Sequence, residues 1–334
     1  MFLINPKSGV QNKRALPEMI VSGIDKKRYD YSIMETKYVA HASELTLEAV
    51  KSGVDVVVAV GGDGTVNEVA RVLVGTDTAL GILPCGSGNG LARHLGVPLD
   101  FKKAIEFINV SQKTAVDYGK INGQPFFCTC GIGFDAFVSN SFAKGKNRGP
   151  MGYFQNMLYD WLNYKPEVYE IETEHRNEKF KAFLIACGNA SQYGNNAYIA
   201  PRASMRDGLL SVTILEPFSS LDVPIILSHI FGHRINSNGH VKTLDARWVK
   251  IKRKSRGVVH FDGEPTEMDA ELFVEIVPEG LNVLASPQWD GTSKPVPIYK
   301  QVVELLNSSL PVLPNIPPLS ALPPLSKGKN IFKK

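Results

Sequence analysis

The sequence feature that most constrains the fold is an almost unbroken run of β-branched residues that ends in a glycine-rich turn. Residues 54–60 read VDVVVAV and are followed at once by GGDG at residues 61–64. A strand of this composition is typical of a parallel sheet that is buried on both faces. From Thr65 onward, apolar side chains return at helical spacing. We therefore expect a buried strand, a tight glycine turn and a helix in direct succession.

This geometry predicts a phosphate site. A glycine turn at the start of a helix brings bare backbone N–H groups and the positive helix end close to a bound anion. Asp63 lies in the middle of the turn, where its carboxylate would repel a phosphate unless a divalent cation lies between them. The alternative is a simple tight turn between a strand and a helix. The motif therefore indicates metal–nucleotide chemistry, with a structural turn as the competing interpretation.

Strand-like and helix-like segments alternate along the first third of the chain, and a second glycine-rich turn, PCGSGNG, occupies residues 84–90. This alternation predicts a doubly wound parallel sheet, Rossmann-like, with ligands at the carboxyl edge of the strands. We assign residues 1–115 to such a nucleotide-binding α/β domain. The expected strands are residues 2–4, 29–34, 54–60 and 80–83. A first expected helix ends near residue 22, and three others span residues 41–52, 65–73 and 101–108.

The pattern changes after residue 115, where most segments alternate like half-buried strands separated by turns. We expect residues 116–292 to form a mostly antiparallel β-sandwich domain. Residues 293–310 are expected to contain a helix that packs back on the body, and the proline-rich basic tail, residues 311–334, to be extended and disordered. The expected strands are residues 126–130, 168–173, 181–187, 209–215, 247–251, 257–261 and 271–277, and the expected helices are residues 153–164 and 221–231.

The composition suits a globular protein with a mild basic bias. A chain of 334 residues can build two domains with substantial cores, and its formal net charge is +4. No apolar run reaches the length of a membrane span, and the first residues resemble a strand and not a signal peptide. The cysteines lack zinc spacing and lie in apolar segments, so we expect reduced thiols in a cytoplasmic protein. They are Cys85, Cys128, Cys130 and Cys187.

Two further motifs lie where the chain turns. NPKSG, residues 5–9, follows the first expected strand; its amides, Asn5 and Lys7 would face a phosphate, unless it is only a capped Pro-Gly turn. FDGEP, residues 261–265, is by itself an Asp-Gly hairpin turn after a strand. Each motif alone is compatible with a purely structural role.

Together the four motifs NPKSG, GGDGTVNE, LPCGSGN and DGEP resemble the diacylglycerol kinase catalytic family, whose relatives include sphingosine, ceramide and, more distantly, NAD kinases. They occur in family order, and the resemblance covers residues 1–287. NPKSG and DGEP argue against an NAD kinase. Bacterial diacylglycerol kinase relatives usually carry a GTxNDFAR-like string, so Ser87 and Gly90 depart from it. The GSGN string with the following Leu-Ala is more similar to the sphingosine and ceramide kinase version.

The resemblance implies a proton acceptor and an ATP site. Glu264 would take the proton of the acceptor hydroxyl, because a primary alcohol is a poor nucleophile without a nearby base. Asp262 would support Glu264, and Asp63 completes the predicted catalytic set. Thr36 resembles the threonine that touches ATP in the bacterial enzymes, although a helix N-cap role is equally compatible with its position. The predicted ATP-binding residues are Asn5, Lys7, Ser8, Thr36, Gly61, Gly62, Asp63, Gly64, Thr65, Asn67, Gly86, Ser87 and Asn89.

The resemblance also implies two Mg²⁺ sites. One is a nucleotide-bound Mg²⁺ near Asp63, reached directly or through water. The other is a structural Mg²⁺ held by Asp207 of the MRDGL segment with the backbone carbonyls of Ser204 and Leu209; the alternative here is a type I turn. Asp117 and Asp135 lie where the family carries acidic groups, and their roles stay open.

The expected function is transfer of the γ-phosphate of ATP to a lipid hydroxyl, with diacylglycerol as acceptor and phosphatidic acid as product. A sphingoid-base kinase, an NAD kinase-like enzyme and a non-catalytic nucleotide or lipid sensor are the alternatives. The expected partners are a membrane lipid and a second copy of the chain in a homodimer.

We expect peripheral contact with the inner face of the membrane from the cytoplasm. Basic residues alternate along residues 250–256; they form either a solvated face or a surface for anionic headgroups. Nucleic acid is not expected, because no aromatic residues are interleaved with these charges.

Overall fold

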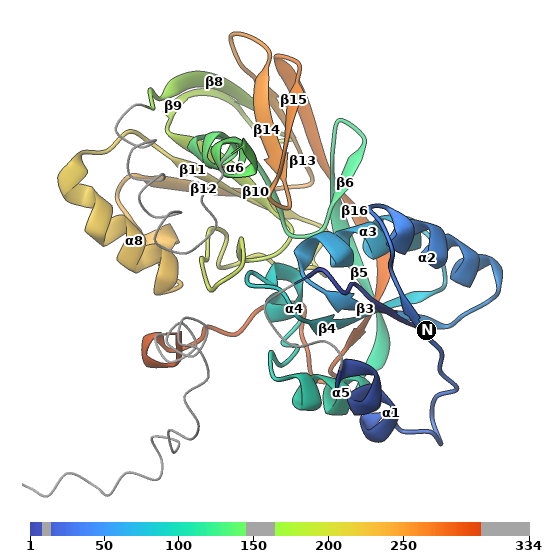
Figure 1. Ribbon diagram of the computed structural model, residues 1–334. Coiled ribbons are helices and arrows are strands. Elements are labelled where there is room, and N and C mark those ends of the chain that lie inside the picture. Colours follow the sequence, from blue (N-terminus) through green and yellow to red (C-terminus); the bar gives the residue numbers. More distant parts are fainter. Residues whose placement is uncertain (9–14, 145–163, 302–334) are drawn as a thin grey trace, which may run out of the picture. The chain divides into compact units, whose positions relative to one another are not determined.

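The computed structural model describes residues 1–8, 15–144 and 164–301 (Figure 1). Internal contacts divide the chain into two units, Met1–Pro295 and Val296–Lys334. All motifs named above lie in the first unit. The predicted helix at residues 153–164 lies outside the described residues except for Tyr164. The predicted tail at residues 311–334 lies wholly outside them, and the helix within residues 293–310 is described only as far as residue 301.

A parallel sheet with a helix after each strand forms the first part of unit Met1–Pro295, as predicted. Its strand order is β2-β1-β3-β4, and the backbone at the carboxyl ends of β1, β3 and β4 leads into the predicted phosphate motifs. Almost all side chains of β1, β3 and β4 are buried, which explains their unbroken apolar character. The elements are β1 (Phe2–Ile4), α1 (Leu16–Gly23), β2 (Ile33–Glu35), α2 (His41–Lys51), β3 (Val56–Gly61), α3 (Asp63–Leu73), β4 (Ala79–Pro84), α4 (Gly90–His94) and α5 (Phe101–Val110).

The strand predicted at residues 29–34 was wrong in its bounds, because β2 covers only Ile33–Glu35. The N–H groups of Arg28 and Tyr29 both donate to the carbonyl of Asp25, at 3.1 and 3.0 Å. These bonds close a turn that ends at Tyr29, and the paired register with β1 begins only at Ile33, opposite Phe2.

The largest departure from prediction concerns the strand expected at residues 271–277. The observed strand β16 (Glu271–Ala285) has 15 residues and pairs antiparallel with β5 (Gln112–Ile121) along most of its length. Near its end Val283 pairs with Leu80 of β4, so β16 joins the parallel sheet. A register irregularity between Val277 and Leu281 interrupts the alternation, which is why the sequence pattern ended too early.

One ten-stranded sheet therefore runs through both predicted domains, and β5 spans the predicted boundary at residue 115 (Figure 1). A second, six-stranded antiparallel sheet has the order β12-β11-β10-β7-β14-β15. Apolar side chains of the two sheets pack against each other in one core, which confirms the predicted β-sandwich. The remaining elements are β6 (Gln124–Phe126), β7 (Thr129–Gly133), α6 (Phe134–Lys144), β8 (Glu167–Glu172), β9 (Asn177–Ala182), β10 (Leu184–Gly188), β11 (Leu210–Leu215), α8 (Val223–Phe231), β12 (Val241–Ala246), β13 (Trp248–Lys252), β14 (Gly257–Phe261) and β15 (Glu264–Met268).

Two predicted strands are each broken into two. Residues 126–130 are divided between β6 and β7, and residues 181–187 between β9 and β10. In both cases the first strand belongs to the ten-stranded sheet and the second to the six-stranded sheet. The chain therefore passes from one sheet to the other at each break, while its apolar pattern continues because both sheets face the same core. Helix α6 was not predicted.

Buried His94 joins three parts of the first unit. It lies in α4 with 1% exposure; its Nδ1 is 3.1 Å from the Ser191 hydroxyl, and its Nε2 is 3.0 Å from the Gly291 carbonyl. Burial lowers the pKa of His94 to about 4, despite the bond to Gly291. The imidazole is therefore neutral in the folded protein throughout the physiological range.

This depressed pKa predicts a loss of stability in mild acid. Between pH 6.5 and 4 the unfolded chain binds a proton at His94 and the folded chain does not, so the free energy of unfolding falls as the pH falls. The contribution is roughly 3 kcal/mol at the lower limit. Urea unfolding at pH 7.5 and pH 4.5 should give a smaller pH-dependent loss for His94→Asn than for the wild type. His175→Asn, at an exposed histidine, should behave like the wild type; equal losses in all three proteins would contradict the prediction.

Candidate active site

The two glycine turns lie against each other, backbone to backbone. A Cβ atom built on Gly86 would come within 2.6 Å of the Gly62 Cα, and one on Gly61 within 2.6 Å of the Thr65 side chain. Neither position can hold a larger residue without movement of the backbone or of a buried side chain. Helix α3 begins at Asp63, directly after this contact. The close approach leaves the backbone of both turns at the carboxyl edge of the parallel sheet.

Asp63 holds the second glycine turn to the first. Its Oδ2 accepts a hydrogen bond from the Asn89 N–H at 2.9 Å, and its Oδ1 accepts one from the Gly90 N–H at 2.8 Å. The Asn89 side chain closes the second turn, since it accepts from the Gly86 N–H at 3.0 Å and donates to the Gly86 carbonyl at 2.7 Å. The sequence did not predict this clamp. Both carboxylate oxygens of Asp63 are already engaged, which favours a water-mediated contact to a cation over direct ligation.

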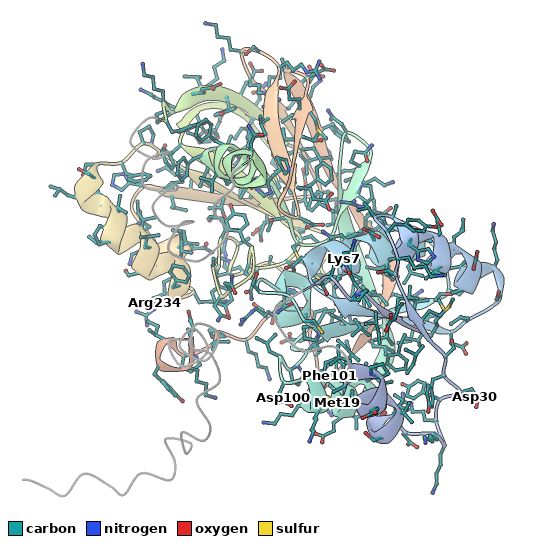
Figure 2. All side chains as sticks on the ribbon, in the orientation of Figure 1. Lys7, Met19, Asp30, Asp100, Phe101 and Arg234 are labelled. Carbon is teal, nitrogen blue, oxygen red and sulfur yellow. The ribbon has the colours of Figure 1, made fainter. Side chains whose placement is uncertain are left out.

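The NPKSG motif meets the first glycine turn. The Asn5 amide donates to the Thr65 hydroxyl at 2.9 Å, and its oxygen accepts from the Lys7 N–H at 3.0 Å. Ser8 closes the same turn through its hydroxyl, 3.1 Å from the Asn5 carbonyl. Lys7 is exposed in this turn and is labelled in Figure 2. At the neighbouring strand end, the Thr36 N–H donates to the Ile4 carbonyl at 2.9 Å.

The predicted ATP-binding residues therefore gather where the parallel strands end. Asn5 and Thr36 follow β1 and β2, the first glycine turn follows β3, and the second follows β4. Gly64 and Ser87 are exposed at this edge, whereas Asn67 is buried in α3. This edge offers backbone N–H groups, one lysine and several hydroxyl and amide groups, which is the set of donors that a polyphosphate needs.

Glu264 contacts the helix that starts in the first glycine turn. Its Oε2 lies 2.8 Å from Nη2 of Arg71, with side-chain exposures of 46% for Glu264 and 29% for Arg71. The Arg71 guanidinium carbon is also 5.6 Å from the centre of the Phe261 ring. Asp262 and Gly263 form the hairpin turn between Phe261, the last residue of β14, and Glu264, the first residue of β15. Their φ angles are 50° and 81°. Sequence reasoning missed Arg71, because its partner lies 193 positions away.

Asp262 binds backbone instead of facing the nucleotide edge. Its carboxylate accepts hydrogen bonds from the N–H groups of Phe127 at 2.8 Å, Cys128 at 2.7 Å and Thr129 at 3.2 Å. Burial raises the pKa of Asp262 to about 6, although the three N–H donors and Arg71 act in the opposite direction. The carboxylate thus fixes the segment in which the chain passes between the two sheets. Its predicted support of Glu264 stays a prediction.

The predicted structural Mg²⁺ segment forms a tight turn. Oδ1 of Asp207 accepts a bond from the Leu209 N–H at 3.0 Å, and Ser204 pairs with Thr292 in an isolated β-bridge. Buried Asp117 accepts from the N–H groups of Gly208 and Glu279, at 2.8 and 2.9 Å. Burial, with Asp117 as an additional cause, raises the pKa of Asp207. The neighbouring carboxylates of Asp117 and Asp207 provide a negative potential that suits a hard cation, so these residues fit the predicted metal.

Asp135 belongs to a buried cluster in the sandwich domain. Its Oδ2 accepts a bond from the Tyr193 hydroxyl at 2.9 Å and lies 2.9 Å from Nε2 of His260. The side chains of His260 and Asp135 are 2% and 9% exposed. The cluster connects α6, β14 and the segment that follows β10. Gly194, the residue after Tyr193 in that segment, contacts Gly88 of the second glycine turn.

Within residues 1–8, 15–144 and 164–301, no three His, Cys, Asp or Glu side chains are grouped to hold a metal ion. A Mg²⁺ at the nucleotide edge would therefore be held mainly by phosphate oxygens and water, as Mg²⁺ commonly is. Asp63 is the acidic side chain at this edge that fits a contact through water.

The fold joins an α/β nucleotide-binding domain to a β-sandwich, and its DGE hairpin contacts the first helix after the glycine turn. This arrangement defines a two-domain nucleotide-dependent phosphotransferase. Residues 1–121 match the diacylglycerol kinase catalytic domain. Residues 128–285 match the YegS C-terminal NAD kinase beta sandwich-like domain. The chain belongs to the YegS-like family of lipid kinases. ATP is the co-substrate that membership of a kinase family implies.

Named relatives agree with this assignment. A "Probable lipid kinase YegS-like" protein of Chromohalobacter salexigens is 32% identical over 251 residues, which cover 73% of this chain and 80% of the relative. A "Probable lipid kinase YegS" of Escherichia coli is 30% identical over 253 residues, covering 74% and 83%. A crystal structure of a diacylglycerol kinase from Bacillus anthracis superposes with a TM-score of 0.67 at 22% identity, covering 86% and 96%; it supports the fold. No helix in the described part of the chain is long and apolar enough to cross a membrane.

The Asp63 clamp predicts a measurable cost of neutralising this carboxylate. In Asp63→Asn one carboxylate oxygen becomes an NH₂ group that faces a backbone N–H, so a buried donor loses its acceptor. We expect the free energy of unfolding to fall by about 1–3 kcal/mol and nucleotide affinity to fall with it. Urea unfolding and calorimetric ATP titration measure both quantities. Asp30→Asn, at an exposed carboxylate, is the matched control; a variant at Asp63 that behaves like this control would refute the clamp.

Proposed function

We propose that this protein transfers the γ-phosphate of ATP to the hydroxyl of diacylglycerol and so produces phosphatidic acid. The observation that carries this proposal is the contact between Glu264 and Arg71, 2.8 Å apart. Arg71 lies on the same helix as Asp63 and the first glycine turn. The contact therefore links the sandwich residue that the family pattern names as proton acceptor to the helix whose N-terminus suits the phosphates.

In the proposed reaction the chain's own residues position and polarise the reactants. Backbone N–H groups of residues 61–65 and the N-terminus of α3 stabilise charge on the transferred phosphoryl group. Asn5 orients the Thr65 hydroxyl at this edge. Glu264 accepts the proton of the lipid hydroxyl as the hydroxyl oxygen attacks the γ-phosphorus in line. The bond from the γ-phosphorus to the β–γ bridging oxygen breaks, and ADP leaves. Asp63 would hold a bound Mg²⁺ through water, and such an ion would supply neutralisation of phosphate charge.

The membrane part of the proposal is a peripheral contact with the inner leaflet from the cytoplasm. The basic residues along 250–256 are a weak basis for it, because most of them are engaged within the protein. Arg253 donates to the carbonyls of Gly257, Val258, Met268 and Asp269. The ion pairs are Lys250 with Glu271 at 2.7 Å, Lys252 with Glu170 at 3.7 Å and Arg256 with Glu267 at 3.5 Å.

The reaction is tested by incubating the protein with labelled ATP, Mg²⁺ and micelles that carry diacylglycerol, a sphingoid base or ceramide separately. We expect label in diacylglycerol, and a loss of at least about 100-fold in kcat for Glu264→Gln, since general-base catalysis contributes factors of this size. Glu267→Gln, on the same strand and in an exposed ion pair, should keep the wild-type rate. Label in another lipid would reassign the acceptor. If the folded, ATP-binding protein transfers no label to any lipid, the proposal is overturned. An NAD kinase-like activity or a non-catalytic sensor role would then be tested.

Arg71 is expected to act as a positioning residue for Glu264. Arg71→Met keeps most of the side-chain volume over Phe261 but removes the ion pair, so the carboxylate loses its anchor. We expect kcat to fall by about tenfold or more, because small misplacements of a reacting group have effects of this size. KM for ATP should stay unchanged, since the glycine turns are intact. Stability should change by less than about 1 kcal/mol, because the pair is partly exposed.

Arg71→Lys should restore part of kcat, and Arg202→Met, which removes the exposed pair with Asp245 at 3.7 Å, should have no effect. A parallel loss of kcat and stability in Arg71→Met would show that Arg71 has only a structural role.

A further inference from the structure

Helix α8 (Val223–Phe231) carries apolar residues on opposite sides. On one side Ile226 is 4% exposed and Ile230 packs against a cluster that contains Phe183 and Ile199. On the other side lie Leu221, just before the helix, and Ile225 and Phe231, with exposures of 84%, 53% and 41%. A helix that is apolar all round is normally covered on all sides. Among residues 1–8, 15–144 and 164–301, no apolar partner covers Leu221 and Ile225 on the exposed side of α8.

The exposed positions of α8 differ from those of other helices in the same chain. The solvent side of α2 carries Glu44, Glu48 and Lys51, and that of α5 carries Lys102, Lys103 and Glu106. By contrast, residues 223–233 contain no Asp, Glu, Lys or Arg, and the other exposed positions of α8 are Pro224 and Ser228. Transfer of this side into an apolar medium therefore desolvates no formal charge, so the side is suited to hydrocarbon and not to water.

The charged groups at the two ends of α8 have opposite signs and different environments. Arg234 is exposed directly beyond the helix, as Figure 2 shows. Asp222, at the start, accepts bonds from the Ser219 N–H at 2.9 Å and the Ser219 hydroxyl at 2.8 Å. Its carboxylate also lies 3.5 Å from Nε2 of His240. The acid is therefore engaged within the protein, while the cation extends into solvent beside the apolar side. This arrangement complements an anionic headgroup layer above hydrocarbon.

We propose that the α8 face, defined as Leu221, Pro224, Ile225, Ser228 and Phe231, docks into the headgroup–hydrocarbon boundary of a bilayer that contains anionic lipid. This inference rests on the proposed function, because a lipid acceptor has to be taken from a bilayer. The α8 face supplies the apolar contact and Arg234 the contact to headgroup phosphate.

A short path of hydrogen bonds connects α8 with the nucleotide edge. The Tyr198 N–H donates to the Ile230 carbonyl at 3.2 Å, and the Asn195 N–H donates to the Gly88 carbonyl in the second glycine turn at 3.1 Å. A built Cβ atom on Gly194 would lie 3.0 Å from Gly88, so these segments touch. Helix α8 is thus in contact with a segment that also contacts the second glycine turn.

Flotation with vesicles tests the docking surface without any turnover. Vesicles of phosphatidylcholine alone and of phosphatidylcholine with the anionic lipid phosphatidylglycerol are mixed with the full chain of 334 residues. We expect binding that is stronger on the anionic vesicles and that falls by about tenfold or more in the double variant Ile225→Glu/Phe231→Glu. Val110→Glu, at a residue of α5 with 65% exposure, is the matched control and should bind like the wild type. Thermal unfolding of each variant checks that folding is intact.

The outcomes separate this inference from the proposed function. Equal flotation of the double variant and the wild type, or no flotation on either vesicle, overturns the docking surface. Loss of a dimer in the double variant, measured by light scattering, also overturns it and assigns the face to a second copy of the chain. Phosphorylation of water-soluble dioctanoylglycerol by the double variant at the wild-type rate supports docking, because only vesicle-bound acceptor is then lost. Flotation without transfer to any acceptor refutes the proposed function and leaves the docking surface standing.

Discussion

The pairing of β16 with β5 is the interaction on which the rest of the structure depends. It continues from Val274 opposite Ile121 to Ala285 opposite Gln112, and at Val283 the same strand also joins β4. Through these pairings, strands from both predicted domains form one sheet. The arrangement is stable because buried backbone hydrogen bonds are costly to leave unmade. The helix with Arg71 follows β3 of this sheet, and the hairpin with Glu264 belongs to the six-stranded sheet that packs against it in one core.

Carboxylates acting on backbone N–H groups assemble the site. Asp63 binds two N–H groups of the second glycine turn, and Asp262 binds three N–H groups where the chain crosses between sheets. Such charge-assisted bonds are stronger than neutral ones, so they can hold a close glycine contact and an irregular crossing in place. Both residues belong to the family motifs, yet each makes hydrogen bonds to distant backbone that the motif alone does not predict. These motif residues therefore also hold the site together.

The fold was predictable wherever local pattern and tertiary role agree. The parallel strands β1, β3 and β4 are buried on both faces, so their apolar runs were sufficient to locate them. Prediction failed where one apolar pattern continues through a change of partner, as at residues 126–130 and 181–187, or where an irregularity interrupts it, as in β16. The periodicity of apolar residues shows which side chains are buried. It does not show which of the two sheets a strand joins. Strand β5, which crosses the predicted boundary at residue 115, pairs with β16 along most of the length of β16.

The sequence by itself determined the class of the protein, because glycine turns and the DGE hairpin depend on residue types that few alternatives can replace. Asn5, Asp63 and Glu264 were all predicted as site residues in this way. Only the tertiary structure decided the neighbours of these residues: Arg71 beside Glu264, the Asn89 and Gly90 N–H groups on Asp63, and Asp135 with His260. These contacts join residues far apart in the chain. Their partners are chosen by strand register and sheet order, which no short stretch of sequence encodes.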